Sequence, residues 1–478
     1  MSNTSTNLAS QRINSLLDEN SFVEIGGLVT ARATDFNMKQ NDTPSDGVIT
    51  GYGVIDGNLV YVYSQDAAVM NGSVGEMHAK KITKLYDLAL KTGTPIIGLL
   101  DSAGLRLQEA TDALNGFGEI YLKQTMASGV IPQITAIFGT CGGGLAMIPT
   151  LTDFTFMEEK TAKLFVNAPN ALDGNEISRC DTSSAAFQSE TSGIVDVVAK
   201  EADIISQIRQ LVSILPANNE DDASYDECTD DLNRASEELV NCVGDTSIAL
   251  STISDNNFFF EVKENYAKDM VTGFIRLNGM TVGAVANRTE VYDADGKVTD
   301  TFDTVLSARG CRKAADFVTF CDAFDIPVLS LTNVTGYQAT TCSEKAIAHA
   351  CAKLTYAFAH ATVPKVNVVI GKAYGTAYIA MNSKSIGADI TMAWPNAEIG
   401  AMDATLAAKI MYEGQGAEVI TAKAAEYAAL QTSVTGAAKR GYVDQIIEAA
   451  DTRKYVIGAF EMLFTKREDR PSKKHGTV

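Results

Sequence analysis

Apolar residues along the chain follow two patterns, one with the period of a helix and one typical of buried strands. Residues 47–63 contain two alternating apolar runs separated by Asp56-Gly57, which predicts a β-hairpin. Residues 75–91 carry apolar positions at helical spacing, and the continuous apolar run at 95–100 indicates a fully buried strand. Buried strands that alternate with helices predict parallel βαβ units, so we expect an α/β fold.

The stretch 132–147, PQITAIFGTCGGGLAM, predicts a buried strand that runs into a glycine-rich turn and then a helix. Gly142, Gly143 and Gly144 carry no side chain, so the backbone there can turn sharply and direct its amide N–H groups at a ligand. This arrangement suits an anion without needing a charged side chain. The same glycines also fit a tight strand-to-helix turn that binds nothing, and on this segment alone both interpretations stay open.

The second half of the chain repeats the first. Residues 95–104 align without gaps to residues 327–336, and residues 132–143 align to residues 364–375. Both pairs share an offset of 232 residues (327 minus 95, and 364 minus 132). Two long segments in one register predict a duplicated α/β unit.

The boundary between the two copies is expected near a change in composition. Thr50-Gly51-Tyr52 pairs with Thr272-Gly273-Phe274 at an offset of 222, which indicates a ten-residue insertion in the second copy. Residues 216–238 are acidic and poor in large apolar side chains, and we interpret them as an exposed, solvated connector. We therefore expect domains at residues 1–245 and 246–478.

Because of the repeat, the glycine turn has a second copy at residues 371–377, GKAYGTA. Each copy lies between a parallel strand and a helix, at the carboxyl end of the strand, where open parallel sheets bind ligands. Backbone amides in such a turn can stabilise an oxyanion, by roughly 3 to 4 kcal/mol per donor in a water-poor site. The repeat thus predicts a pair of oxyanion sites.

Composition excludes some partners. With a net charge of -20, the chain would be repelled by nucleic acid and by an anionic membrane surface. It has no uncharged apolar run of about 18 residues and no signal-peptide core in its polar N-terminus, so we expect a cytoplasmic protein without membrane insertion. The eight cysteines form no CxxC pair, which favours reduced, buried thiols over disulfides or a zinc site.

Five blocks of the sequence resemble one known family. They are residues 51–82, DSAGLRLQE at 101–109, GKAYGTAYIAMNSKSIGADITMAWPNAEI at 371–399, RGYVDQIIEAADTR at 440–453 and KKHG at 473–476. In order and over nearly the whole chain, they are similar to the carboxyltransferase subunit of biotin-dependent acyl-CoA carboxylases and decarboxylases, such as propionyl-CoA carboxylase β and methylmalonyl-CoA decarboxylase α. The resemblance implies two crotonase-like (ClpP/crotonase) ββα-superhelix domains, in agreement with the repeat.

The resemblance also implies a reaction. N-carboxybiotin on a carrier protein exchanges its carboxyl group with the α-carbon of a short acyl-CoA, and methylmalonyl-CoA and propionyl-CoA are the expected pair. One oxyanion hole, in the N-terminal domain, holds the enolate oxygen of the thioester, and the other, in the C-terminal domain, holds the ureido enolate of biotin. By motif, the catalytic residues are Gly143 and Gly144 for the thioester and Gly375, Thr376 and Ala377 for biotin.

Further residues and partners follow from the same resemblance. The substrate-binding residues expected around the two holes are Ser102, Ala103, Gly104, Thr335, Gly336, Tyr374 and Ile379. Biotin on a separate carrier is the expected cofactor, acyl-CoA the substrate, and no metal is expected in this chain. The expected partners are a biotin carboxyl carrier protein and either a biotin carboxylase or a membrane decarboxylase subunit. The two holes should meet across subunits, so a homo-oligomer, a dimer or a hexamer, is expected.

The chain departs from the family pattern mainly around the second hole. The turns read CGGG and AYGTAY where members usually show CAGG and AYGGAY, so Thr376 replaces a glycine. Ile379 lies where propionyl-CoA enzymes often carry an acidic residue, and the facing loop reads TNVTGY in place of the common DVPGF. Residues 178–196 replace a stretch that usually contains glycine and histidine. A carboxylase, a decarboxylase or a transcarboxylase can accommodate these changes, and so can a subunit that has lost activity.

Two other functions stay open. A biotin-independent crotonase-type hydratase or hydrolase would need a catalytic carboxylate opposite one hole. A non-catalytic scaffold subunit would only bind acyl-CoA. The four histidines, His78, His349, His360 and His475, form no Ser/His/Asp or Cys/His set in the sequence, and we expect them in the core or on helix surfaces.

Overall fold

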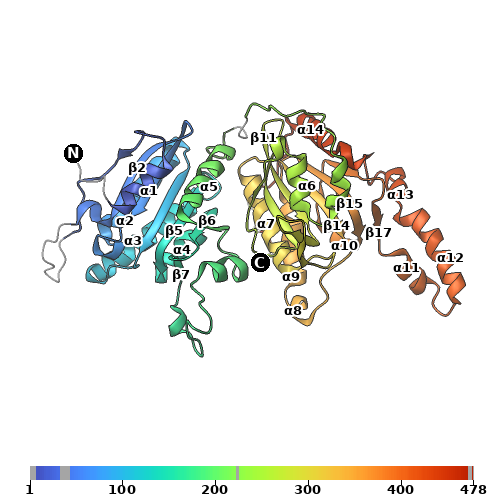
Figure 1. The fold of residues 1–478 in the computed structure, drawn as a ribbon, viewed down its shortest axis with the longest axis horizontal. Helices are drawn as coiled ribbons and strands as arrows, with labels where there is room; N and C mark the ends of the chain where they lie inside the picture. The colour runs from blue at the N-terminus through green and yellow to red at the C-terminus, as the bar shows by residue number, and fades with distance from the viewer. Residues whose placement is uncertain (1–6, 33–42, 222–225, 472–475, 477–478) are drawn as a thin grey trace. The chain divides into compact units, whose positions relative to one another are not determined.

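A computed structural model describes residues 7–32, 43–221, 226–471 and 476 of the chain. The contacts divide the chain into two units, Met1–Ser224 and Tyr225–Val478. Within the described residues, each unit holds an eight-stranded sheet with helices packed on it (Figure 1). Parallel strands and helices alternate in both units, so the expected α/β class is confirmed.

The sheet of the first unit has the strand order β1-β2-β3-β4-β5-β6-β8, and β7 pairs with β5. The first three strands are antiparallel, and the pairs from β3 to β8 are parallel. The strands are β1 (Val23–Glu24), β2 (Val48–Ile55), β3 (Asn58–Gln65), β4 (Ile96–Ser102), β5 (Gln133–Gly142), β6 (Phe154–Glu158), β7 (Lys163–Phe165) and β8 (Val197–Ala199). The helices are α1 (Leu8–Leu16), α2 (Glu76–Thr92), α3 (Ala110–Ala127), α4 (Met147–Thr150) and α5 (Glu201–Ile214).

The sheet of the second unit has the same arrangement, in the order β9-β10-β11-β14-β15-β16-β18 with β17 paired to β15. Its strands are β9 (Phe260–Glu261), β10 (Met270–Leu277), β11 (Met280–Asn287), β14 (Val328–Val334), β15 (Lys365–Tyr374), β16 (Ile390–Ala393), β17 (Glu398–Gly400) and β18 (Gln445–Ile446). A separate hairpin consists of β12 (Glu290–Tyr292) and β13 (Val298–Thr301). The helices are α6 (Thr246–Ile253), α7 (Ala308–Ala323), α8 (Thr341–Glu344), α9 (Ile347–His360), α10 (Gly375–Ala380), α11 (Ala404–Met411), α12 (Ala417–Tyr427), α13 (Val434–Lys439) and α14 (Thr452–Leu463).

The structure confirms the internal repeat. The strands β14 and β15 start 232 residues after β4 and β5 (328 minus 96, and 365 minus 133), and β10 starts 222 residues after β2 (270 minus 48). The ten additional residues fall between β11 and α7, where the second unit carries the hairpin of β12 and β13. The insertion inferred from the sequence is therefore accommodated by a hairpin outside the main sheet.

Most described residues of the connector at 216–238 are exposed, as expected for a solvated connector, and part of it also contacts a buried arginine of the second unit. In the second unit, Arg453 Nε donates to the carbonyl of Asp231 at 3.1 Å, and the Arg453 guanidinium lies 3.6 Å from Asp230. The division between the units falls at Ser224, ahead of the boundary at residue 245 inferred from composition. Arg453 therefore holds part of the connector, while most described side chains of the connector face solvent.

Local chemistry explains the first hairpin. Asp56 and Gly57 adopt φ angles of 49° and 84°, both in the left-handed region that a two-residue type I′ hairpin turn requires. Glycine tolerates this region because it has no Cβ, and aspartate tolerates it better than most residues. The turn fixes the register of β2 against β3, and hence which of their side chains face the core.

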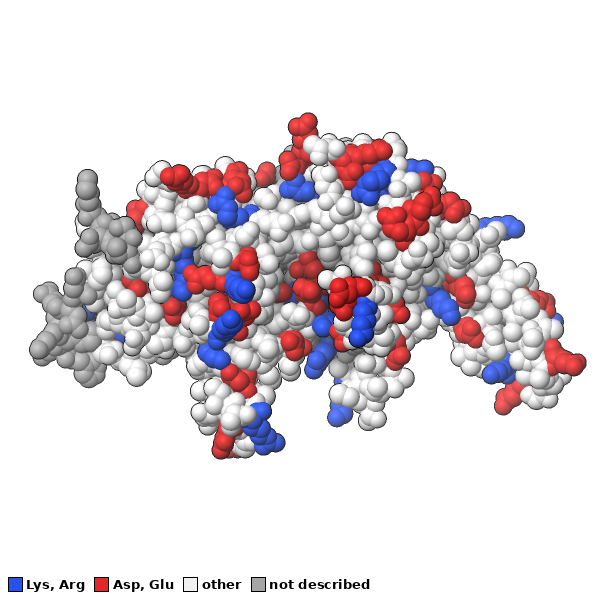
Figure 2. Space-filling model, in the orientation of Figure 1, with Lys and Arg blue, Asp and Glu red and all other residues white. Residues whose placement is uncertain are grey.

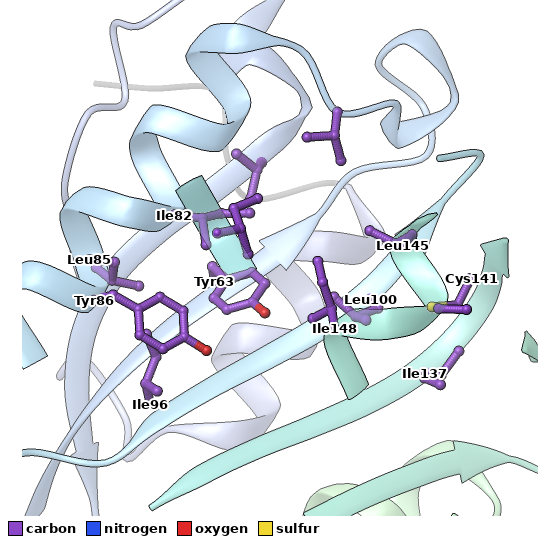
Figure 3. Close-up of a cluster of buried hydrophobic side chains, with 14 of the residues drawn as sticks. Tyr63, Ile82, Leu85, Tyr86, Ile96, Leu100, Ile137, Cys141, Leu145 and Ile148 are labelled. Carbon is purple, nitrogen blue, oxygen red and sulfur yellow. The ribbon is translucent and has the colours of Figure 1, made fainter. Parts of the chain in front are cut away.

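A cluster of buried side chains lies around the first glycine turn in the first unit. Figure 3 shows Leu100, Ile137, Cys141, Leu145 and Ile148 in this cluster, and none of them is exposed to solvent. Full burial of an aliphatic side chain of this size stabilises the fold by about 1.5 to 3 kcal/mol. Cys141 is part of this core, and burial raises the pKa of its thiol, which disfavours the reactive thiolate.

Candidate functional site

The first glycine turn connects β5 to a short helical segment. Gly143 has a φ of 63° and begins a 3₁₀ turn over Gly143–Ala146, which continues into the four-residue α4. The helix expected from the sequence is thus present but short. The amides of Gly143 and Gly144 are at its start, where no carbonyl of the helix can accept them. A Cβ built on Gly143 would meet nothing within 4 Å, so this face of the turn is open.

The DSAG loop lies directly beside this turn. Ser102 at the end of β4 is in register with Cys141 of β5. Gly104 has a φ of 96°, and a Cβ on it would lie 3.1 Å from the carbonyl oxygen of Gly142. Ser102 is buried and its Oγ accepts from the Gly104 amide at 3.1 Å, whereas Ala103 is exposed. The structure brings these three residues next to the turn, and the serine hydroxyl accepts a hydrogen bond within the loop itself.

A buried ion cluster holds the residues that follow the DSAG loop. Arg106 Nη1 donates to Asp46 Oδ1 at 2.6 Å and to Glu109 Oε1 at 2.8 Å, and Nη2 donates to the Ser73 carbonyl at 2.7 Å. Burial raises the pKa of Asp46, and the Arg106 charge opposes this effect. The His78 amide donates to Asp46 Oδ2 at 2.8 Å. Burial, assisted by Arg106, lowers the pKa of His78 to about 3, so His78 is a neutral core residue.

The second glycine turn has the same backbone geometry as the first. Gly375 has a φ of 62° and opens α10, and a Cβ on it would lie 3.3 Å from the carbonyl oxygen of Ala401. Thr376 is exposed and Ala377 is buried. Gly375, Thr376 and Ile379 contribute to the lining of a cavity of about 940 Å³, so the structure brings these three predicted residues together.

A second cavity, of about 710 Å³, lies in the same unit. Its lining includes Thr335 and Tyr337 from the loop after β14, and Gly371 and Lys372 from β15. Val334 at the end of β14 is in register with Ala373, so this loop lies beside the second turn as the DSAG loop lies beside the first.

The predicted residues Gly336 and Tyr374 have structural contacts here. The carbonyl of Gly336 accepts from the Leu306 amide at 2.9 Å. Tyr374 is buried and its hydroxyl donates to Glu398, and burial followed by this hydrogen bond raises the pKa of the phenol. Tyr374 is therefore a buried residue at the start of α10, directly before the turn.

Two amide side chains brace the two sites in the same way, and the sequence did not reveal them. The Asp101 amide donates to Gln65 Oε1 at 3.2 Å, and in the second unit the Asn333 amide donates to Asn287 Oδ1 at 3.1 Å. Gln65 and Asn287 are the last residues of β3 and β11 and are related by the 222-residue offset. The signal was present in the repeat, since an amide side chain recurs at the aligned position.

The cysteines and histidines occupy ordinary positions. All eight cysteines are free thiols, as expected, but only Cys141, Cys311, Cys321 and Cys351 are buried, so the expectation of burial was wrong for the others. His349 is exposed on α9 and His360 is half-buried at its end. His475, with most of the KKHG block, lies outside the described residues.

Three further features concern nucleic acid, membranes and metal ions: surface charge, helix length and clusters of ligand side chains. On the face shown in Figure 2, acidic and basic side chains are interspersed. Within the described ranges, none of the helices combines the length and the apolar character that crossing a bilayer requires. In the same part of the chain, no three His, Cys, Asp or Glu side chains are grouped closely enough to hold a metal ion.

Comparison with known proteins gives consistent matches over the full length. The model of the carboxyl transferase domain matches residues 3–478. The methylmalonyl-CoA decarboxylase subunit alpha of Veillonella parvula is 41% identical, over 98% of this chain and 92% of the relative. The propionyl-CoA carboxylase beta chain of Roseobacter denitrificans is 40% identical, over 98% of this chain and 93% of the relative. A crystal structure of transcarboxylase 12S, a hexamer with methylmalonyl-coenzyme A and methylmalonic acid bound, matches with a TM-score of 0.92 at 38% identity, over 99% of this chain and 93% of that one.

Proposed function

The chain belongs to the carboxyl transferase family and has the duplicated crotonase-like fold that the sequence blocks predicted, and from this premise we propose that it transfers a carboxyl group between N-carboxybiotin and the α-carbon of a short acyl-CoA. Methylmalonyl-CoA and propionyl-CoA are the proposed pair. Relatives at 40% and 41% identity are named for these compounds, and the transcarboxylase structure contains methylmalonyl-CoA. The family match over residues 3–478 carries the proposal and favours it over a hydratase or a scaffold subunit.

We assign the thioester oxygen to the first glycine turn. Exchange of a carboxyl group at the α-carbon places negative charge on the thioester oxygen. The amides of Gly143 and Gly144 are the donors proposed for this oxygen, since the turn leaves them without an acceptor in the helix. Two such donors lower the barrier by roughly 3 to 4 kcal/mol each where water is excluded. Ser102, Ala103 and Gly104 form the loop beside them.

We assign biotin to the second glycine turn. Biotin supplies the carboxyl group, or accepts it, through its ureido ring. The ring and its aliphatic chain need a cavity that is largely apolar, and Tyr378, Ile379 and Ala437 line the 940 Å³ cavity. Any side chain at position 375 would narrow the space beside the turn, because its Cβ would lie 3.3 Å from the carbonyl oxygen of Ala401. The residues present therefore fit biotin.

The amides of Gly375, Thr376 and Ala377 are the proposed donors to the ureido oxygen. They occupy the first positions of α10, where the helix has no carbonyl to accept them. Thr335, Gly336, Tyr374 and Ile379 would then form the surrounding walls and contact substrate. No side-chain base is required in this assignment, in agreement with the neutral, buried His78.

The reaction requires further proteins. We propose a biotin carboxyl carrier protein and either a biotin carboxylase or a membrane decarboxylase subunit as partners. We also propose a homo-oligomer, a dimer or a hexamer, because the relative of known structure forms a hexamer. The free thiols suit the reducing conditions of the cytoplasm, which is the proposed compartment.

A direct assay tests this proposal. The purified chain is mixed with free biotin and methylmalonyl-CoA, then with malonyl-CoA, and decarboxylation is followed by separating the acyl-CoA products. We expect turnover that depends on biotin, with the reaction lacking biotin as the control. Equal decarboxylation without biotin would show a biotin-independent reaction, release of free CoA would support a hydrolase, and acyl-CoA binding without any turnover would support a scaffold. Any of these results would refute the proposed reaction.

A further inference from the structure

Two side-chain hydroxyls meet at the second glycine turn. Tyr337, from the loop after β14, donates its hydroxyl to Thr376 Oγ1 at 2.7 Å. Thr376 is the second residue of α10, one position after the left-handed Gly375. The hydrogen bond therefore connects the loop beside the turn to the turn itself.

The two residues of this hydroxyl pair line different cavities of the second unit. Thr376 lines the 940 Å³ cavity together with Gly375 and Ile379. Tyr337 lines the 710 Å³ cavity together with Thr335 and Lys372. Both side chains are exposed, so a ligand in the larger cavity can reach the threonine hydroxyl next to the turn.

The first glycine turn has no such pair. At the 232-residue offset, Tyr337 corresponds to Leu105 and Thr376 corresponds to Gly144. The carbonyl of Gly144 instead accepts from the hydroxyl of Tyr121 on α3. The two turns have nearly identical φ angles at Gly143 and Gly375, 63° and 62°. They therefore differ in side-chain chemistry and not in backbone geometry.

The arrangement of the pair defines what Thr376 can do. Partial burial raises the pKa of Tyr337, so its hydroxyl remains protonated and acts as a donor. A hydroxyl that accepts one hydrogen bond keeps its own hydrogen for a second partner. With Tyr337 fixed on one side, the hydrogen of Thr376 is directed away from it.

We propose that Thr376 Oγ1 is an additional donor to the ureido oxygen of biotin, and that Tyr337 is the positioning residue that orients this hydroxyl. The inference rests on the assignment of biotin to the second turn. The hydroxyl would add to the donors that the backbone amides supply, and neither Gly144 nor the glycine usual at position 376 in the family has one.

Four variants separate the hydroxyl from the shape of the side chain. Thr376→Val keeps the β-branched shape and the backbone amide but removes the hydroxyl, and Thr376→Ser keeps the hydroxyl. Tyr337→Phe removes the orienting donor. Tyr455→Phe, on α14 and outside both cavity linings, is the matched control for loss of a tyrosine hydroxyl. Biotin affinity is measured by calorimetry, and biotin-dependent decarboxylation of methylmalonyl-CoA is measured in parallel.

We expect Thr376→Val to weaken biotin binding by about 2- to 10-fold, since one neutral hydrogen bond is lost. We expect a larger loss of kcat, roughly 10- to 100-fold, because the bond strengthens when charge develops on the oxygen. Thr376→Ser should stay within about 3-fold of wild type, and the KM for methylmalonyl-CoA should not change. Tyr337→Phe should have an intermediate effect that disappears when Thr376→Val is already present.

The outcomes distinguish this inference from the proposed function. If wild type turns over with biotin and Thr376→Val matches the Tyr455→Phe control in affinity and kcat, the inference is wrong and the proposed function stands. Additive effects of Tyr337→Phe and Thr376→Val would refute the positioning role. If wild type binds biotin without turnover, the proposed function fails and the affinities still test the donor. If wild type does not bind biotin, the inference is overturned.

Discussion

Replacement of Arg106 by methionine should destabilise the first unit by about 3 to 5 kcal/mol. The side chain is 1% exposed and forms ion pairs with Asp46 and Glu109, both of which are buried. Methionine fills a similar volume but leaves two carboxylates close together without a cation, and an uncompensated buried charge is costly. Two hydrogen bonds to Ser73 are lost as well.

The loss should depend on pH in a defined direction. Burial raises the pKa of Asp46 above its ordinary value, and Arg106 opposes this, so the variant should raise the pKa further. A carboxyl with a raised pKa binds more protons in the folded state than in the unfolded state. Stability therefore falls as pH rises through the window between the unfolded and the folded pKa. The deficit of Arg106→Met should be larger at pH 8 than at about pH 5.5.

The chain offers its own reporters for this experiment. It has a single tryptophan, Trp394, which lies in the second unit, so fluorescence follows that unit and circular dichroism follows both. In urea, Arg106→Met should shift a transition seen by circular dichroism and leave the Trp394 transition unchanged. Arg453→Met is the counterpart in the second unit, where Arg453 donates to Asp255 at 2.6 Å, and it should shift the fluorescence transition.

An exposed arginine provides the control. Arg32 pairs with Glu76 and Asp112 at the surface, and such pairs contribute about 0 to 1 kcal/mol. Arg32→Met should therefore be nearly neutral. If Arg106→Met lowers the free energy of unfolding no more than Arg32→Met does, the charge of Arg106 does not stabilise the DSAG loop region. If Arg106→Met shifts the Trp394 transition as strongly as Arg453→Met does, the two units do not unfold independently.

Three further predictions concern the turns, pH and assembly. Gly143→Ala should lower the free energy of unfolding in urea by about 1 to 2 kcal/mol through its positive φ alone. Gly139→Ala should lower it more, because the new Cβ would clash with the Asp101 carboxylate. Equal losses in the two variants would contradict this. Burial lowers the pKa of Lys81 to about 8, so the unfolded state binds more protons and stability rises with pH between about 8 and 10.5, by at most about 1.4 kcal/mol per unit. Lys81→Met should flatten this rise, and an unchanged slope would refute the assignment. Light scattering should show a dimer or a larger homo-oligomer, and a monomer that turns over would contradict the shared site.

Local patterns predicted the elements around the site well. The Asp56-Gly57 hairpin and the helix at 75–91 follow from turn chemistry and apolar spacing within one segment. The repeat supplied long-range information, because a single offset in the sequence relates the two glycine turns to each other. The positions of Gly143 and Gly375 in equivalent left-handed turns could therefore be predicted from the sequence.

Contacts between distant segments could not be predicted in this way. The Tyr337–Thr376 bond joins residues 39 positions apart, and Arg453 binds the connector 222 positions earlier. Neither pair has a periodic signal, since each partner is placed by a different element. The contact of the acidic connector with Arg453, which is buried on α14, was missed for this reason.

The two copies of the unit agree in backbone geometry at the glycine turns and differ in the side chains there. The two copies keep the same backbone at the glycine turns and the same amide brace from Gln65 and Asn287. Geometry kept in both copies serves what both sites share, which is the binding of an oxygen by backbone amides. Thr376 adds a side-chain hydroxyl beside amides that are present in both turns, and Gly144 has no such group. Thr376→Val and Thr376→Ser isolate this difference, because both keep the backbone amides and only the serine keeps the hydroxyl.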